Sequence, residues 1–257
     1  MKKLIPLLLL LIAMPSLAQR QFDIEVIIFQ RAVNPEQTSE SWPNSLPEIN
    51  VTQAGNFSDT QYRHSKGVMM LPYSDYQLNE QVQRLRNHAG FQVMLHTAWR
   101  QGDQGKARAP IFHIQAGQDY SQQFNPDGSE RVKSEQGDSP IDGVMEQTID
   151  HPLYELDGTL QIYVQHFLYA EAMLDLKKPS VREITLKDQK LDLDIENEQD
   201  SDPTVQVGHL TAISPTVETE SFLKSYRLDQ KRRMRSSETH YLDHPLLGII
   251  IQVRRVQ

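Results

Sequence analysis

Hydrophobic and polar residues alternate most regularly between Phe222 and Met234. The even positions carry most of the apolar side chains, and the odd positions from Arg227 onwards are charged. This period of two predicts a strand with one buried face. After a turn that ends in Pro245, the apolar run from Leu246 to Val253 predicts a second, more deeply buried strand.

Strands and one helix are also predicted nearer the amino terminus. Phe22 to Arg31 carries apolar residues on both faces, which is typical of a central strand. Tyr73 to His88 has the apolar stripe of a helix, Gly90 is a typical stop, and Phe91 to Arg100 alternates again. Strand, helix and strand together predict a β-α-β unit, with parallel strands if the crossover is ordinary.

The middle of the chain predicts a short strand at Pro110 to Gly117 and one long strand that continues through Leu176. The tetrad at 150–153, Asp-His-Pro-Leu, recurs at 243–246, in each case before a strand-like run. Because Pro fixes the approach of the chain and His and Asp can bond to local backbone, the echo indicates a shared turn geometry. Duplication of a domain is the alternative.

These elements predict an α+β fold: a mostly antiparallel β-sheet with a β-α-β unit, of which a ferredoxin-like arrangement is one form, and long hairpin arms and loops. We expect one domain over residues 19–257. Irregular insertions are expected near 34–67 and 119–150, and an acidic arm at 183–204. Trp42, in the first insertion, is expected to fasten that loop to the body.

Residues 1–18 have the three parts of a signal peptide: two lysines, a short apolar stretch and small residues before Gln19. They predict a protein exported to the periplasm with no membrane span in its mature form, and an uncleaved anchor is the alternative. The chain has no cysteine, which excludes disulfides, cysteine catalysis and thiolate metal sites. Its net charge is −8, and it would become −10 without the two leading lysines, which argues against nucleic acid as a partner.

Charge is distributed unevenly near the carboxyl end. The segment 183–202 holds eight acidic residues and two lysines, whereas 224–255 holds eight basic and three acidic residues. The two segments either neutralise one another or leave a surface for an anionic ligand.

No catalytic or cofactor signature is found. His240 and His244 have the spacing of a helical zinc pair, but they flank a turn and the metalloprotease motif is absent, so no metal is predicted. No nucleophile elbow and no phosphate-binding glycine loop is present. Around Tyr241 and Asp243, a hydrogen-bonded structural corner competes with direct ligand contact.

Three stretches together resemble one family: FDIEVIIFQR with the downstream Glu36 and Trp42-Pro43, GFQVMLHTAWRQ, and RRMRSSETHYLDHPLLGIIIQV. They are similar to CsiV-type peptidoglycan-binding proteins, exported proteins of Gram-negative gammaproteobacteria. The resemblance implies binding to the cell wall and support of peptidoglycan assembly and cell shape. It also implies, as partners, a bifunctional penicillin-binding protein and its outer-membrane lipoprotein activator. It supplies no catalytic residues.

The resulting hypothesis is a non-enzymatic peptidoglycan-binding protein without cofactors. It requires cationic groups that are exposed and free of the chain's own acids, because these would meet the carboxylates of the wall. A wall-cleaving hydrolase and a purely protein-binding scaffold are the alternatives. The candidate binding residues are Arg227, Lys231, Arg233, Arg235, His240, Tyr241 and His244.

Overall fold

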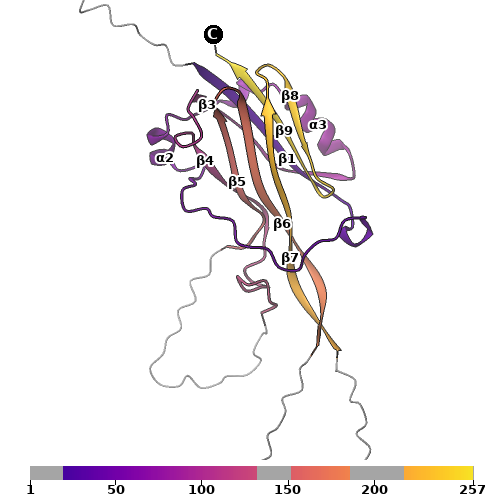
Figure 1. The fold of residues 1–257 in the computed structure, drawn as a ribbon. Coiled ribbons are helices and arrows are strands. Elements are labelled where there is room, and N and C mark those ends of the chain that lie inside the picture. Colours follow the sequence, from indigo (N-terminus) through magenta and orange to yellow (C-terminus); the bar gives the residue numbers. More distant parts are fainter. Residues whose placement is uncertain (1–19, 132–151, 186–216, 257) are drawn as a thin grey trace, which may run out of the picture.

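Two antiparallel sheets face each other in a computed structural model, which describes residues 20–131, 152–185 and 217–256 (Figure 1). The first sheet has the order β2 (Met69–Met70), β3 (Phe91–Gly102), β1 (Gln21–Arg31), β9 (Leu247–Arg255), β8 (Thr239–Asp243). The second has the order β4 (Ile111–Asp119), β5 (Tyr154–Val164), β6 (Leu168–Thr185), β7 (Val217–Met234). The helices are α2 (Thr60–Ser65) and α3 (Asn79–Asn87), with 3₁₀ turns η1 (Pro35–Gln37) and η2 (Tyr73–Asp75).

The main core lies between the two sheets. Even-numbered residues of β1, such as Ile24 and Val26, point into it together with Trp99 of β3. Leu160 and Leu174 reach the same cluster from the second sheet. Each sheet therefore buries one face and presents the other outwards, as the period of two requires.

β1 is buried on both sides, as expected for a central strand. It pairs with β3 along one edge and with β9 along the other. On its outward face, Ile27 and Phe29 pack under Leu78 and Val82, at the start of and within α3. The predicted α+β fold dominated by antiparallel sheet is confirmed.

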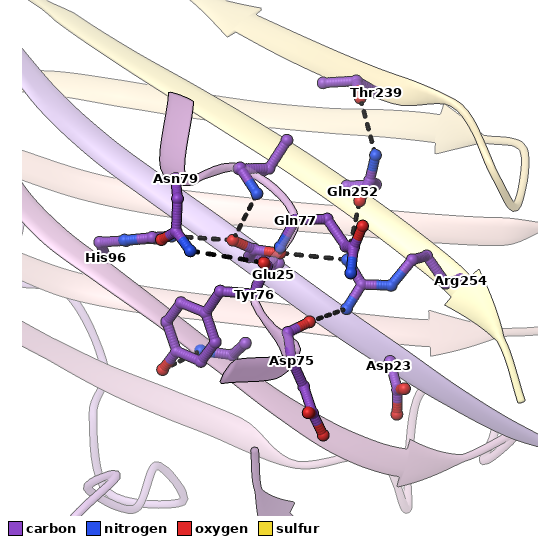
Figure 2. A network of polar contacts seen from close by, with 12 residues as sticks. Asp23, Glu25, Asp75, Tyr76, Gln77, Asn79, His96, Thr239, Gln252 and Arg254 are labelled. Atoms are coloured by element: carbon purple, nitrogen blue, oxygen red, sulfur yellow. Dashed lines mark hydrogen bonds and ion pairs between the residues drawn. The ribbon is translucent and has the colours of Figure 1, made fainter. Parts of the chain in front are cut away.

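One charged side chain, Glu25, is completely buried in this strand. Its carboxylate accepts hydrogen bonds from the backbone amides of Gln77 (2.7 Å) and Leu78 (2.9 Å), directly before α3, and from Arg254 Nη1 (3.1 Å). His96 Nε2 lies 2.9 Å from Oε1, the oxygen that also accepts from Leu78 (Figure 2). Burial by itself raises the pKa of Glu25, but the hydrogen bonds from His96, the two amides and Arg254 lower it, so the carboxylate form is the stable one.

The parallel β-α-β unit was a wrong prediction. β3 runs antiparallel to β1, with Arg31 opposite Phe91, and the amide of Ala32 donates to the carbonyl of Gly90. The segment between them therefore leaves β1 and enters β3 at the same end of the sheet, and its helix does not carry the chain back to the opposite end. The two-sheet arrangement also differs from a ferredoxin-like fold.

The predicted long strand through Leu176 is two strands. Val164 pairs with Leu168, and residues 165–167 form the turn between β5 and β6. Because three residues separate the paired positions, the alternation of apolar side chains continues through the turn without a break. The turn also contains no glycine, proline, asparagine or aspartate, so neither a break in the alternation nor a turn-forming residue indicates it in the sequence.

The predicted helix Tyr73–His88 is shorter than expected. The chain makes the 3₁₀ turn η2, is extended at Tyr76, and begins α3 only at Asn79. Glu25 accepts hydrogen bonds from the amides of Gln77 and Leu78, directly before α3, in place of the bonds of a longer helix.

The first insertion packs against the body, as expected for Trp42. The Trp42 ring lies 5.5 Å from the Tyr226 ring and 5.0 Å from the His244 ring, and its indole nitrogen donates to Thr38 Oγ1. His244 is itself buried in the turn between β8 and β9, where its Nδ1 accepts from the amide of Leu246. Burial lowers the pKa of His244, although the nearby charge of Glu40 opposes the shift.

The end of β6 that leads to Thr185 and the beginning of β7 at Val217 pair with each other and extend beyond the body as a long arm (Figure 1). Most of the predicted acidic arm at 183–204 and much of the predicted insertion at 119–150 lie outside the described residues, as do the predicted signal peptide and the first half of the 150–153 tetrad. Within the described ranges, no helix is both long and apolar enough to cross a bilayer.

Replacing Glu25 with glutamine should lower the free energy of unfolding by about 3 kcal/mol, because Arg254 is left without its anion and an amide oxygen cannot serve four donors. Urea denaturation measures the change. The matched control is Glu80→Gln, which removes an exposed pair with Arg84 on α3 and should change stability little. Equal effects of the two substitutions would contradict the assignment of Glu25 as an anchor.

Stability should fall as the pH decreases through the ordinary histidine value of 6.5, partly because of His244. Below that pH the unfolded chain binds a proton that the buried imidazole of His244 does not readily accept. The contribution of His244 to stability is therefore present above the ordinary histidine pKa and is lost as the pH falls below it. Urea denaturation at about pH 7.5 and about pH 5.5 should show a smaller difference for His244→Gln than for the natural chain. An unchanged difference would show that His244 does not contribute to the pH dependence.

Candidate functional site

The seven candidate residues do not form one surface. Arg227 and Lys231 lie on the outward face of the second sheet, and so does Arg233, each opposite an odd-numbered residue of β6. Arg235 follows the end of β7, and the three aromatic candidates, His240, Tyr241 and His244, belong to β8 or to the turn after it. Tertiary structure therefore distributes the predicted group over the second sheet, a turn, the first sheet and the interior.

Arg227 is neutralised within the chain. Its Nε and Nη2 each donate to a different oxygen of Asp175, both at 2.8 Å, and its side chain is only 14% exposed. The hydrogen bonds to Asp175 raise the pKa of Arg227, so this cation is fixed in place. The hypothesis of exposed cations that are free of the chain's own acids therefore fails at Arg227.

An aromatic–cation cluster occupies the end of the same face that is remote from the arm. At its centre, the Tyr163 and Tyr169 rings stack with centroids 5.5 Å apart, and Lys231 Nζ lies 5.0 Å from the Tyr169 centroid. Lys106, from the loop before β4, covers the Tyr163 ring at 5.7 Å. The members of the cluster are Lys106, Tyr163, Phe167, Tyr169, Glu171, Lys231 and Arg233.

Glu171 joins the polar groups of this cluster. Its carboxylate lies 2.6 Å from Lys106 Nζ and 3.1 Å from Lys231 Nζ, and it accepts from the Tyr163 hydroxyl at 2.7 Å. The Tyr163 oxygen and the Glu171 carboxylate raise the pKa of Lys231 to about 12. Lys231 is thus permanently charged but shares its charge with an anion of the chain.

Arg233 is the member of the cluster that is best placed to meet a ligand. Its guanidinium lies 4.5 Å from the centroid of the Phe167 ring, which is 50% exposed at the β5–β6 turn. It forms no ion pair with any residue in the described ranges. A guanidinium held flat on an aromatic ring keeps its edge donors available for a carboxylate.

The turn after β7 is organised locally. Ser237 has a positive φ of 68°, and the amide of Arg235 donates to His240 Nε2 at 3.0 Å. Arg235 and Glu238 are 3.7 Å apart and both well exposed, so their attraction is weak. His240 therefore has the contacts of a structural corner.

Tyr241 lies on the outward face of the first sheet, away from the other candidates. Its ring stacks on Phe29 at 6.3 Å, its hydroxyl donates to Asp243 at 2.9 Å, and it accepts a hydrogen bond from Arg31. His244, in the same region of the chain, points inwards against Trp42. Neither side chain is positioned to act together with Lys231 and Arg233.

A second feature of the outward face, which the sequence did not predict, is a mixed-charge cleft of about 670 Å³. Figure 1 shows the first insertion crossing the strands of the second sheet near the base of the arm, and its residues 43–49 and Val51 line one wall. The floor holds His113, Asp157, Asp175, Lys177 and Arg227. These residues come from four strands, and no spacing in the sequence links them.

The charges of the floor are paired across strands. Asp157 lies 2.7 Å from His113 Nε2 and accepts from Lys177 Nζ at 3.1 Å. Burial raises the pKa of Asp157, but His113 and Lys177 outweigh burial and lower it. Among the described residues, no group of three or more His, Asp or Glu side chains is arranged to hold a metal ion, and His240 and His244 lie on a strand and a turn instead of a helix.

Comparison with known proteins supports the family resemblance. A family model described as "Peptidoglycan-binding protein, CsiV" matches residues 3–256. Neither a curated protein nor a solved structure matches the chain. Since the matching model covers nearly the whole sequence, the chain belongs to the CsiV family of peptidoglycan-binding proteins.

Proposed function

We propose that this protein binds peptidoglycan in the periplasm, without cleaving it, through the aromatic–cation cluster on the second sheet. Membership of the family supports the class of ligand. The single observation that supports the surface is the exposed pair of Phe167 and Arg233, which lies beside Lys231.

The chemistry of the cluster suits a glycan that carries peptides. Sugar rings have flat apolar faces that pack on an aromatic side chain, and the wall's peptides and lactyl groups supply carboxylates for arginine. Phe167 offers the ring, and Arg233 offers donors at its edge. Because Glu171 balances the neighbouring lysines, recognition at this surface depends on stacking and directed hydrogen bonds more than on net positive charge.

The lowered pKa of Asp157 in the cleft supports a binding role over a hydrolytic one. A glycosidase needs a carboxylic acid that keeps its proton near neutral pH, which requires a raised pKa. The pKa of Asp157 is lowered, so this carboxylate lacks the character of a general acid.

A role in wall assembly follows as part of the proposal. The signal-like residues 1–18 would deliver the mature chain to the periplasm. There, the chain would support a bifunctional penicillin-binding protein through that enzyme's outer-membrane lipoprotein activator. The resemblance of the sequence to its family supports this link.

Truncating the exposed pair should weaken binding to purified sacculi. The double substitution Phe167→Ala, Arg233→Ala should reduce co-sedimentation affinity by about tenfold or more, since it removes a stacking surface and a charge-assisted donor. Arg84→Ala is the control, because Arg84 is an exposed arginine on α3, which covers the first sheet. Unchanged pelleting of the double variant would place the binding surface elsewhere.

The same sedimentation assay distinguishes the three classes of function. Pelleting without soluble muropeptides is the expected result. Released muropeptides would indicate a hydrolase, and absence of pelleting would indicate a protein-binding scaffold.

Glycan synthesis by the penicillin-binding protein, measured with its activator present, should increase when the mature chain is added. The double variant at Phe167 and Arg233 should give a smaller increase if wall binding contributes to the effect. No response to the natural chain would contradict the proposed partners without affecting the pelleting result.

A further inference from the structure

The mixed-charge cleft has an unusual arrangement at its floor. The register of the second sheet places Gln115, Asp157, Asp175 and Arg227 in one row across β4, β5, β6 and β7. Two aspartates thus face each other on adjacent strands. Like charges opposite each other destabilise a sheet, so this row depends on the cations that flank it.

Neighbouring side chains contact both carboxylates. Lys177 and His113 contact Asp157, and Arg227 contacts Asp175. The floor therefore carries closely spaced charges of both signs, and Asp157 remains about a quarter exposed. A site with this pattern disfavours a simple polyanion, because each cation already has an anion beside it.

The floor retains hydrogen-bonding capacity for a ligand. A lysine ammonium has three N–H donors and an arginine has five. Contacts with the described residues use one donor of Lys177 and two of Arg227. The Asp157 carboxylate likewise has lone pairs beyond the two used by His113 and Lys177, so a ligand can bind without breaking the existing pairs.

The walls are more apolar than the floor. The first insertion contributes several aliphatic side chains and prolines above the charged row, and the turn at Asp127–Gly128 and the two residues before β5 close the side. A volume of about 670 Å³ is within the range for a ligand of a few residues. The apolar wall residues are Pro43, Leu46, Pro47, Ile49, Val51, Pro126, Pro152, Leu153 and Leu223.

We propose that the cleft binds the zwitterionic end of a peptidoglycan stem peptide, that is, a diamino acid that carries an ammonium beside a carboxylate. The ammonium would lie near Asp157 and Asp175, and the carboxylate would accept from Lys177 and Arg227. The aliphatic part of the peptide would pack against the insertion. This inference rests on the proposed function and adds a peptide-recognition site to the glycan-facing cluster.

The discriminating measurement is calorimetric titration of the mature chain with a free stem tripeptide, L-Ala-γ-D-Glu-meso-diaminopimelic acid. Two analogues test the two charges: one has lysine as its third residue and lacks the carboxylate, and the other is acetylated on the side-chain amine. Each analogue should bind at least about tenfold more weakly. Equal affinity for all three peptides, or no binding of the first, would overturn the proposal.

Two substitutions test whether the tripeptide binds in the cleft. Asp157→Asn removes the exposed carboxylate, and Ser225→Tyr fills the cleft while every ion pair is retained. Both should weaken tripeptide binding by about tenfold, whereas Arg84→Ala should not. Urea denaturation checks that each variant folds, and should Asp157→Asn fail to fold, an unchanged affinity of Ser225→Tyr would still reject the cleft.

Co-sedimentation with intact sacculi distinguishes a failure of this inference from a failure of the proposed function. If the chain pellets with intact sacculi but does not bind the tripeptide, the cleft proposal is wrong and peptidoglycan binding stands. If it binds the tripeptide but does not pellet, the cleft proposal is supported and binding of the assembled wall is contradicted.

Discussion

The structure depends on a strand that is buried on both faces and yet contains a carboxylate. β1 lies between β3 and β9, with the main core on one side and α3 on the other. Glu25 is stable there only because backbone amides, His96 and Arg254 all direct donors at it. The same bonds fix where α3 begins and tie the last strand of the chain to the first.

The outward face of the second sheet carries both candidate surfaces, the aromatic–cation cluster and the mixed-charge cleft. Among the described residues, α3 partly covers the first sheet, whereas the first insertion and the turn at Asp127–Gly128 cover the second sheet near the arm, where they form the cleft. Trp42 secures that insertion through Tyr226 and His244. The buried corner after β8 therefore supports the cleft wall although it contributes no ligand-facing group.

Charge on this face is compensated at short range. Arg227, Lys231 and Lys177 each contact a carboxylate of a neighbouring strand, which agrees with a chain whose net charge is −8. A protein of this charge does not attract an anionic polymer by its overall field. In the proposed function, contact with the wall therefore depends on local geometry, with Phe167 and Arg233 at one end of this face and the cleft at the other.

The sequence determined the elements whose signals are local. Period-two alternation identified β1, β3 and β7, and the stripe in α3 identified the helix, because each reflects burial of one face of one segment. The family could also be identified from three short stretches. The turn at 165–167 could not, since pairing of Val164 with Leu168 leaves the alternation undisturbed.

Only the tertiary structure decided which charges are free and which residues meet. Arg227 and Arg233 look equivalent in the sequence, but strand register sets Asp175 opposite the first and Tyr169 opposite the second. The antiparallel return of β3 and the row from Gln115 to Arg227 likewise follow from pairing between distant segments. Register is a property of the assembled sheet, so no pattern within one strand can reveal it.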